Sequence, residues 1–150
     1  MLTRTAVVRV DRDPDWVFRE LHDPAALLSC VPGGRITRIF DDHRFEACVV
    51  AGVGPFKITY AGTGRIKDSD PRARSASLTI AGSGVGVPPA KVRMTMAIAE
   101  VGRSAELCMS FRVMLAGSRV SRALVDCIVG DLLDRTVRRI KVQLESRATY

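Results

Sequence analysis

The chain has 150 residues, of which 47% are hydrophobic and 26% are charged, and its formal net charge is +7 at neutral pH. A chain of this length and composition forms a core without disulfides or structural metal ions, which excludes collagen-like, disordered and disulfide-scaffold proteins. We therefore expect residues 1–150 to form a single domain. The positive charge favours an anionic lipid, nucleic acid or an acidic partner.

The location of the protein is predicted from two absences in the sequence. The first ten residues alternate between polar and apolar, and Asp13-Pro14 follows before any apolar run of a signal peptide begins. No run approaches the roughly 18 apolar residues that cross a membrane. The four cysteines contain no CxxC pair, so we expect reduced thiols and no zinc site. These features predict a cytoplasmic protein.

The first elements along the chain are a strand and two short helices. Residues 2–10 alternate as a half-buried strand does. Asp13-Pro14 and Asp23-Pro24 are typical helix starts, with an aspartate as N-cap and proline at the first helical position. Pro32-Gly33-Gly34 ends the second helix.

The rest of the chain predicts a meander of strands followed by one helix. Between Ile36 and Val113 the two-residue period returns, interrupted by turns at residues 41–42, 52–55, 68–71, 82–89 and 102, which gives about six more strands. The final stripe has helical spacing and comprises Val125, Val129, Leu132, Thr136, Ile140 and Leu144. An antiparallel meander buries one face under such a helix. The predicted class is α+β with a helix-grip fold: about seven curved antiparallel strands surround a long C-terminal helix, and an apolar pocket lies between them.

This order of elements resembles the START and birch-pollen-allergen superfamily. Within it, the segments PDWVFRELHDPAALLSCVPGG and VAGVGPFKITYAGTGRI resemble the P-x-x-x-V/W-x-x-L, D-P, C-I-P-G and V-G-V-G-P-x-K motifs of the CoxG-type proteins of carbon monoxide dehydrogenase. AGSRVSRALVD extends the resemblance to about residue 145. The chain departs from the family at Pro88-Pro89, where glycine and alanine are usual. The resemblance implies a quinone-like guest and an accessory role beside the subunits of a molybdenum hydroxylase. We predict no cofactor.

The pocket wall is predicted from the strand alternation, which turns apolar side chains toward the helix and charged ones toward water. Tyr60 alone gives this inner wall a proton donor, so no acid–base pair, catalytic residue or metal site is predicted there. Methionines suit an irregular lipophilic guest. The predicted wall consists of Phe56, Ile58, Tyr60, Leu78, Ile80, Met94, Met96, Met109, Phe111, Val113, Leu124 and Ile128.

Several interpretations stay open. A cyclase or aromatase acting on a polyketide would use Tyr60 with Cys30 or His22, whereas an interaction module would have a collapsed pocket. Excess apolar surface on the first half of the long helix suits pocket lining, a homodimer contact or a partner surface. Gly62 and Gly64 favour sheet curvature over close ligand approach.

The charged surface also has two interpretations. The basic helix end, residues 135–147, would dock on an anionic membrane at its inner face, or it is an ordinary solvated helix face. Nucleic acid binding is not expected, because no basic and aromatic face recurs along the strands.

Overall fold

The computed structural model describes residues 2–53, 55–84, 87–115 and 122–146. Within these ranges, the side chains of residues 2, 51–53, 56, 58, 87–88, 122, 124–125 and 128 lie outside the description. The elements follow the predicted order: β1 (Leu2–Val10), α1 (Pro14–His22), α2 (Pro24–Ser29), β2 (Gly34–Ile39), β3 (Arg44–Val53), β4 (Phe56–Asp70), β5 (Ser75–Gly84), β6 (Val87–Val101), β7 (Ser104–Leu115) and α3 (Arg122–Ser146).

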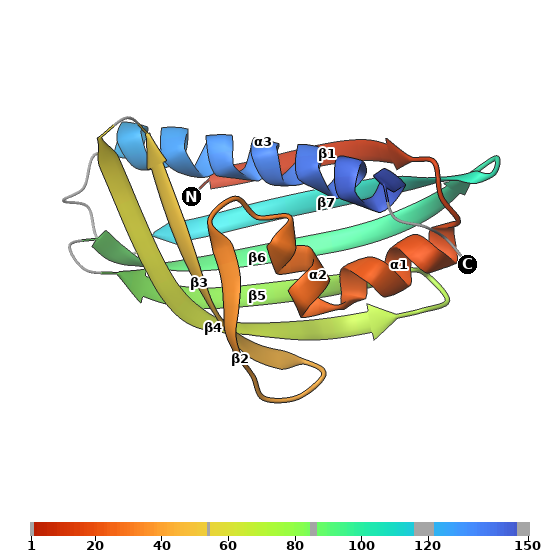
Figure 1. Cartoon of the computed structure of the whole chain (residues 1–150), viewed down its shortest axis with the longest axis horizontal. Coiled ribbons are helices and arrows are strands. Elements are labelled where there is room, and N and C mark those ends of the chain that lie inside the picture. Colours follow the sequence, from red (N-terminus) through yellow and green to blue (C-terminus); the bar gives the residue numbers. More distant parts are fainter. Residues whose placement is uncertain (1, 54, 85–86, 116–121, 147–150) are drawn as a thin grey trace.

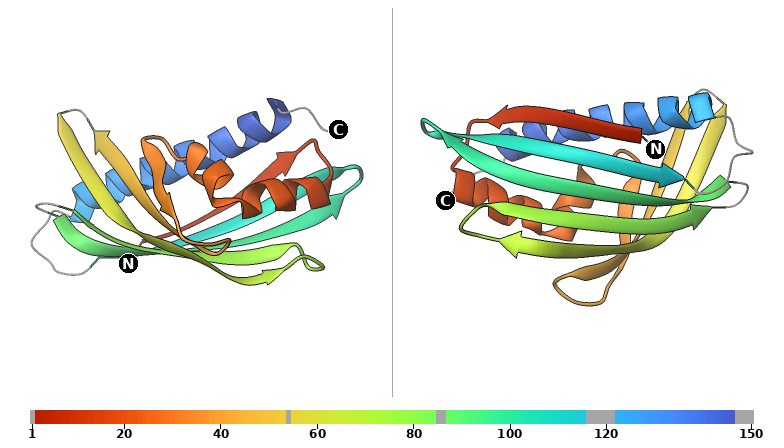
Figure 2. Two further views of the ribbon diagram at one scale, coloured as in Figure 1. Left: turned by 60° about the horizontal axis from the view of Figure 1, so that its bottom comes forward. Right: turned by 180° about the vertical axis from the view of Figure 1, so that it is seen from behind.

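The seven strands form one antiparallel sheet in the order β1-β7-β6-β5-β4-β3-β2. Strands β2 to β7 are a meander, and β1 joins at the β7 edge, with Val10 opposite Ala105. All three helices lie on one side of the curved sheet, and α3 runs along the β1 edge (Figure 1). The views in Figure 2 show the opposite side, the outer face, without a covering helix. The predicted helix-grip class is confirmed.

Both short helices begin where the sequence predicts. The carboxylate of Asp13 accepts a hydrogen bond from the backbone N–H of Trp16 at 3.1 Å, and Asp23 accepts one from Ala25 at 3.1 Å. Each aspartate therefore satisfies an N–H group that has no partner within the helix. These caps fix where the chain leaves β1 and turns onto the inner side of the sheet.

Two predicted turns differ in the structure: the turn predicted at 68–71 lies at 71–74, and the turn predicted at 82–89 is shorter. Strand β4 continues to Asp70 because the irregularity in its pairing between Lys67 and Asp70 absorbs Asp68, whose φ is 52°. Strand β6 begins at Val87, before the Pro88-Pro89 pair, and its pairing with β5 shifts between Gly82 and Gly84. Proline is tolerated at such bulges, so the hairpin needs less loop than residues 82–89.

The C-terminal end of α3 is tied to the end of β1. The Glu145 carboxylate accepts a hydrogen bond from the backbone N–H of Asp11 at 2.9 Å, and Lys141 donates to the carbonyl of Arg9. The bond from Asp11, helped by Lys141, lowers the pKa of Glu145 below its usual 4.5. This contact closes the end of the grip opposite the β3–β4 hairpin.

Glu145→Gln provides a pH test of that contact. A carboxyl group whose pKa is lowered by folding stabilises the folded state at pH values above its unfolded-state pKa. This stabilisation is lost as the pH falls through the folded-state pKa. We expect the wild type to melt at a higher temperature than Glu145→Gln at pH 7. The difference should shrink as the pH falls below the unfolded-state pKa of about 4.3, and it should vanish once the pH is below the lowered folded-state pKa. Thermal melts followed by circular dichroism from pH 3 to pH 7 measure it. A difference that is constant across this range would contradict the assignment.

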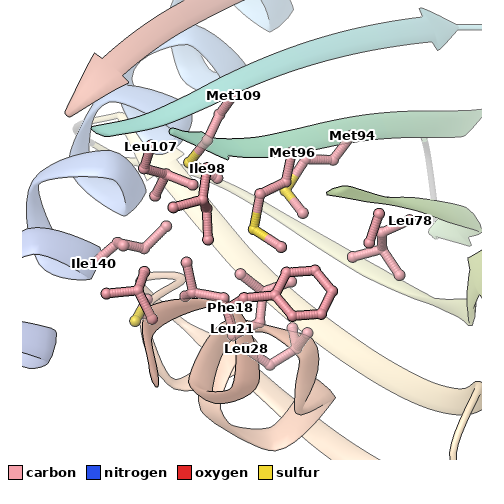
Figure 3. Packing of buried hydrophobic residues seen from close by; sticks show 14 of the residues in the cluster. Phe18, Leu21, Leu28, Leu78, Met94, Met96, Ile98, Leu107, Met109 and Ile140 are labelled. Atoms are coloured by element: carbon pink, nitrogen blue, oxygen red, sulfur yellow. The ribbon is translucent and has the colours of Figure 1, made fainter. Parts of the chain in front are cut away.

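The core lies between the sheet and the helices and is densest under α1 and the second half of α3. Figure 3 shows Phe18 and Leu21 of α1 facing Met96 and Ile98 of β6, with Ile140 of α3 near Leu107. Ile140 and Leu107 are fully buried. This end of the molecule is therefore filled, and free volume is left toward the other end.

Candidate functional site: an apolar cavity beneath the long helix

A cavity of about 170 Å³ lies between the sheet, α2 and the middle of α3. The inner faces of β3 to β7 form its floor, and helical residues cover it. Its described lining comprises Leu27, Leu28, Val31, Val49, Tyr60, Leu78, Ile80, Gly82, Ala90, Val92, Met94, Phe111, Val113, Leu115, Val129, Leu132, Leu133 and Thr136.

The apolar lining of the cavity follows from the spacing of side chains along the strands and along α3. Alternate residues of each strand point to one face of a sheet, and residues three to four apart share one face of a helix. Ile80, Val92 and Val113 lie opposite one another in register on β5, β6 and β7. Val129 and Leu132 of α3 are near-neighbours on the helix face above them. Apolar side chains therefore enclose the space from both sides.

Six predicted wall residues line this cavity: Tyr60, Leu78, Ile80, Met94, Phe111 and Val113. Met96 and Met109 do not; each is only 3% exposed and lies in the core. Met96 is two residues further along β6 than Met94, where α1 already covers the sheet (Figure 3). The side chains of the other four predicted wall residues, Phe56, Ile58, Leu124 and Ile128, lie outside the description.

The structure adds wall residues that the sequence prediction omitted. Leu27, Leu28 and Val31 come from α2 and the segment after it, so the second short helix forms part of the wall. Leu132 and Thr136 belong to the helical stripe visible in the sequence, which carried no sign of where a cavity would lie. Val92 lies two residues before Met94 and so shares its face of the strand, and the structure puts it in the cavity floor.

The described cavity wall carries two polar side chains, Tyr60 and Thr136. The Thr136 hydroxyl donates to the carbonyl of Leu132 at 2.7 Å, one turn earlier in α3. Partial burial raises the pKa of the Tyr60 phenol above its usual 10.0. Tyr60 is therefore neutral at physiological pH and carries an O–H group on a described wall whose other polar side chain, Thr136, is bonded to its own helix.

The residues needed for cyclase chemistry do not meet Tyr60 in the cavity. Cys30 is buried outside the cavity lining, with its sulfur 3.5 Å from the carbonyl of Ala26 and 3.6 Å from the side-chain oxygen of Gln143. His22, at the C-terminal end of α1, contacts the Ser69 hydroxyl at 2.8 Å and is not among the residues that line the cavity. An acid–base mechanism needs two such groups within reach of one substrate atom. The described wall brings no such pair together.

Metal ligands and membrane spans are both missing from the part of the chain that the structure describes. These residues contain no group of three histidine, cysteine, aspartate or glutamate side chains that would hold a metal ion. Among the described helices, none has the length and hydropathy required to cross a bilayer.

The family of the chain follows from a match over residues 7–145 to the family model described as the CoxG subunit of carbon monoxide dehydrogenase. The chain belongs to the CoxG family. This match spans β1 to the end of α3, so both cavity walls of this CoxG family member lie within it. No curated protein matches the sequence.

Solved structures show the same fold at low identity. A conserved protein from Geobacillus kaustophilus superimposes with a TM-score of 0.79 at 15% identity, covering 95% of each chain. The Zhui aromatase/cyclase from Streptomyces sp. R1128 has a TM-score of 0.73 at 11% identity, over 97% of this chain and 94% of its own. Ara h 8.0201 has a TM-score of 0.68 at 16% identity, over 97% and 99%. These similarities establish the fold, and the side chains of the cavity carry the functional argument.

Proposed function

We propose that this CoxG family member binds and carries a lipophilic small molecule with a quinone-like ring and performs no chemistry on it. The observation that carries the proposal is the cavity wall, whose two described polar side chains are the neutral phenol of Tyr60 and Thr136, with the Thr136 hydroxyl bonded to its own helix. The other described lining side chains are hydrocarbon and thioether groups. Burial of an apolar guest there gains free energy in proportion to the area removed from water. A phenol at the wall suits a carbonyl oxygen of the guest.

The size of the cavity limits what it accepts without rearrangement. Its 170 Å³ is close to the roughly 150 Å³ of engineered cavities that bind benzene. It therefore admits one ring, and a fused ring system requires side chains to move. Met94, at the floor, is unbranched and has a polarizable sulfur, so it can change rotamer at little cost.

The partner and location extend the same proposal. The family name supports an association with an oxidoreductase of the carbon monoxide dehydrogenase type, a molybdenum hydroxylase, to which the carrier would be accessory. Exchange of a lipophilic guest would take place in the cytoplasm, at the inner face of the membrane.

The direct experiment combines native mass spectrometry of purified protein, organic extraction of its bound lipids and titration with a short-chain menaquinone analogue. We expect a 1:1 complex and quenching of intrinsic fluorescence that saturates. Absence of both a co-purified lipophile and saturable binding would remove the carrier function.

An interaction module is a second candidate, favoured by the cavity volume. The 170 Å³ lies below the roughly 300 Å³ at which ligand pockets usually begin. In this case the protein would bind another subunit, with the cavity serving only as a packing defect. A protein that binds no analogue and shows no change in amide chemical shifts around Tyr60 would support this candidate over the carrier.

Tyr60→Phe tests the role of the phenol. Loss of one hydrogen bond to the guest is expected to raise the Kd for a menaquinone analogue about 5- to 10-fold, corresponding to about 1 to 1.4 kcal/mol. Fluorescence titration of both proteins measures this ratio. A naphthalene of similar size, which has no carbonyl group, provides the matched control and should bind both proteins equally. Equal losses for the two compounds would show that the substitution damaged the cavity instead of removing a specific bond.

A further inference from the structure

Four arginines lie in one line across the outer face of the sheet. In register, Arg44 of β3 is opposite Arg65 of β4, and Arg65 is opposite Thr79 of β5. Thr79 is in turn opposite Arg93 of β6, which is opposite Arg112 of β7. We call Arg44, Arg65, Arg93 and Arg112 the arginine row. At about 4.8 Å between strands, the row extends roughly 19 Å across five strands.

The charges of the row are largely uncompensated. Arg44 pairs with Asp41 at 3.0 Å, but Arg65, Arg93 and Arg112 form no ion pair with any acidic side chain in the described ranges. All four arginines are exposed. Like charges directly opposite on neighbouring strands destabilise a sheet, and the row contains two such pairs. Among the described residues, the charges of Arg65, Arg93 and Arg112 therefore bring the fold no ion pair, which points to a partner outside the chain.

The surroundings of the row reinforce the positive charge. Lys67 and Lys91 are exposed on the same outer face and line a surface depression of about 410 Å³ together with Arg44, Arg65 and Phe40. The described acidic residue closest in register is Glu46, which is opposite Thr63, one outward position along from Arg65. A hollow with cationic walls accepts a protruding carboxylate-bearing segment.

We propose that the arginine row and its flanking lysines are a docking surface for an acidic face of another protein. The planar guanidinium binds a carboxylate through two parallel hydrogen bonds, and arginine is enriched in protein interfaces. Besides the flanking lysines, several outward positions next to the row carry small side chains, namely Thr63, Ala81, Thr95 and Ser110, so carboxylates can reach the guanidinium groups from that side.

A membrane is the weaker fit to this face. Peripheral membrane surfaces combine cations with large apolar side chains that enter the headgroup region. The exposed large apolar side chains near the row, Phe40 and Met114, lie beside its two ends. Arg93 and Arg112 alternate along their strands with residues that line the cavity, so the row lies on the opposite side of the sheet. Figure 2 shows that no helix covers this side. Docking there leaves α2 and α3, and hence the cavity, facing outward.

The test compares two variants that remove the same charge from different faces. Arg65→Gln/Arg93→Gln/Arg112→Gln removes three positive charges from the row, and Arg135→Gln/Arg138→Gln/Arg139→Gln removes three from α3. The probe is a fluorescent polyglutamate peptide of about 20 residues, titrated by anisotropy at low and at physiological salt. We expect the row variant to lose at least 10-fold in affinity and the helix variant less than 2-fold. The wild type should show peptide-induced amide shifts on β4, β6 and β7.

Each alternative has its own outcome. Equal losses in the two variants would mean a nonspecific charge effect and would overturn the proposal. Binding of phosphatidylglycerol vesicles or of a DNA duplex through the row, without binding of polyglutamate, would overturn it in favour of a membrane or nucleic acid. The melting temperature of the row variant should not fall, because the substitutions remove repulsion between neighbouring arginines. If the triple variant does not fold, the single variant Arg93→Gln is titrated in its place. Binding of the menaquinone analogue should be unchanged, which separates this surface from the proposed carrier function.

Discussion

Val92→Trp is expected to weaken the binding of a short-chain menaquinone analogue by at least about 100-fold. Val92 lies on the inner face of β6, in the centre of the cavity floor, opposite Val113 and Ile80. An indole at this position takes the volume that a guest ring would occupy. A ring that buries roughly 120 Å² of apolar surface gains about 3 kcal/mol at about 25 cal/mol per Å², which corresponds to a little over two decades in Kd.

Thr95→Trp is the matched control for that loss. Thr95 lies on the same strand but is exposed on the outer face, opposite Ser110 and Ser77. It receives the same side chain without entering the cavity, so its Kd should change less than 2-fold. Overpacking at Val92 also costs about 1 to 3 kcal/mol of stability, and melting curves establish that the variant is folded under the titration conditions. If Val92→Trp binds as tightly as the wild type, the guest does not occupy this cavity.

The inner face of the sheet was predictable because its signal is local. Successive side chains of a strand alternate between faces, so the sequence alone assigns Tyr60, Ile80 and Phe111 to the side that the helix covers. The long stripe from Val125 to Leu144 likewise identifies the covering helix from a single window. These two patterns are sufficient for the fold class and for about half of the proposed wall.

The limits of the cavity were not predictable, because they depend on what covers each part of the sheet. Met94 and Met96 share a face and a strand, yet one lines the cavity and the other lies in the core. The difference is set by α1, whose Phe18 fills the space next to Met96 (Figure 3). A two-residue period identifies the face of a side chain but carries no information about the element packed above it.

The arginine row could not be predicted from the sequence, for a related reason. Each of its members appears in the sequence as an isolated surface cation, separated from the next by 19 to 28 residues. The four arginines lie opposite one another only because of the pairing register of five strands. A shift of one residue in any of these pairings would move the arginines on one side of it to the other face of the sheet. Register depends on turn geometry and bulges, and the positions of two turns differ from those predicted.

The second large effect is expected from a substitution at Gly64, which should lower the free energy of unfolding. The sequence favoured sheet curvature as its role, but the structure shows a specific packing reason. A Cβ added at Gly64 would lie 2.2 Å from Cζ of Phe45, the residue opposite it on β3. Phe45 is completely buried, so its ring cannot swing into solvent. Gly64→Ala is therefore expected to reduce the free energy of unfolding by about 2 to 3 kcal/mol, measured by urea denaturation.

A double-mutant cycle separates this packing role from curvature. Phe45→Leu shortens the side chain that occupies the place of the missing Cβ, at a cost of about 1 to 2 kcal/mol when made alone. If Gly64 is required by the Phe45 ring, the double variant should be more stable than the sum of the two losses predicts, by at least about 1 kcal/mol. Additive losses would assign Gly64 to curvature instead. A coupled result would mean that the space left by this glycine is filled by the protein's own core and is closed to a guest, which confines the proposed ligand to the cavity beneath α3.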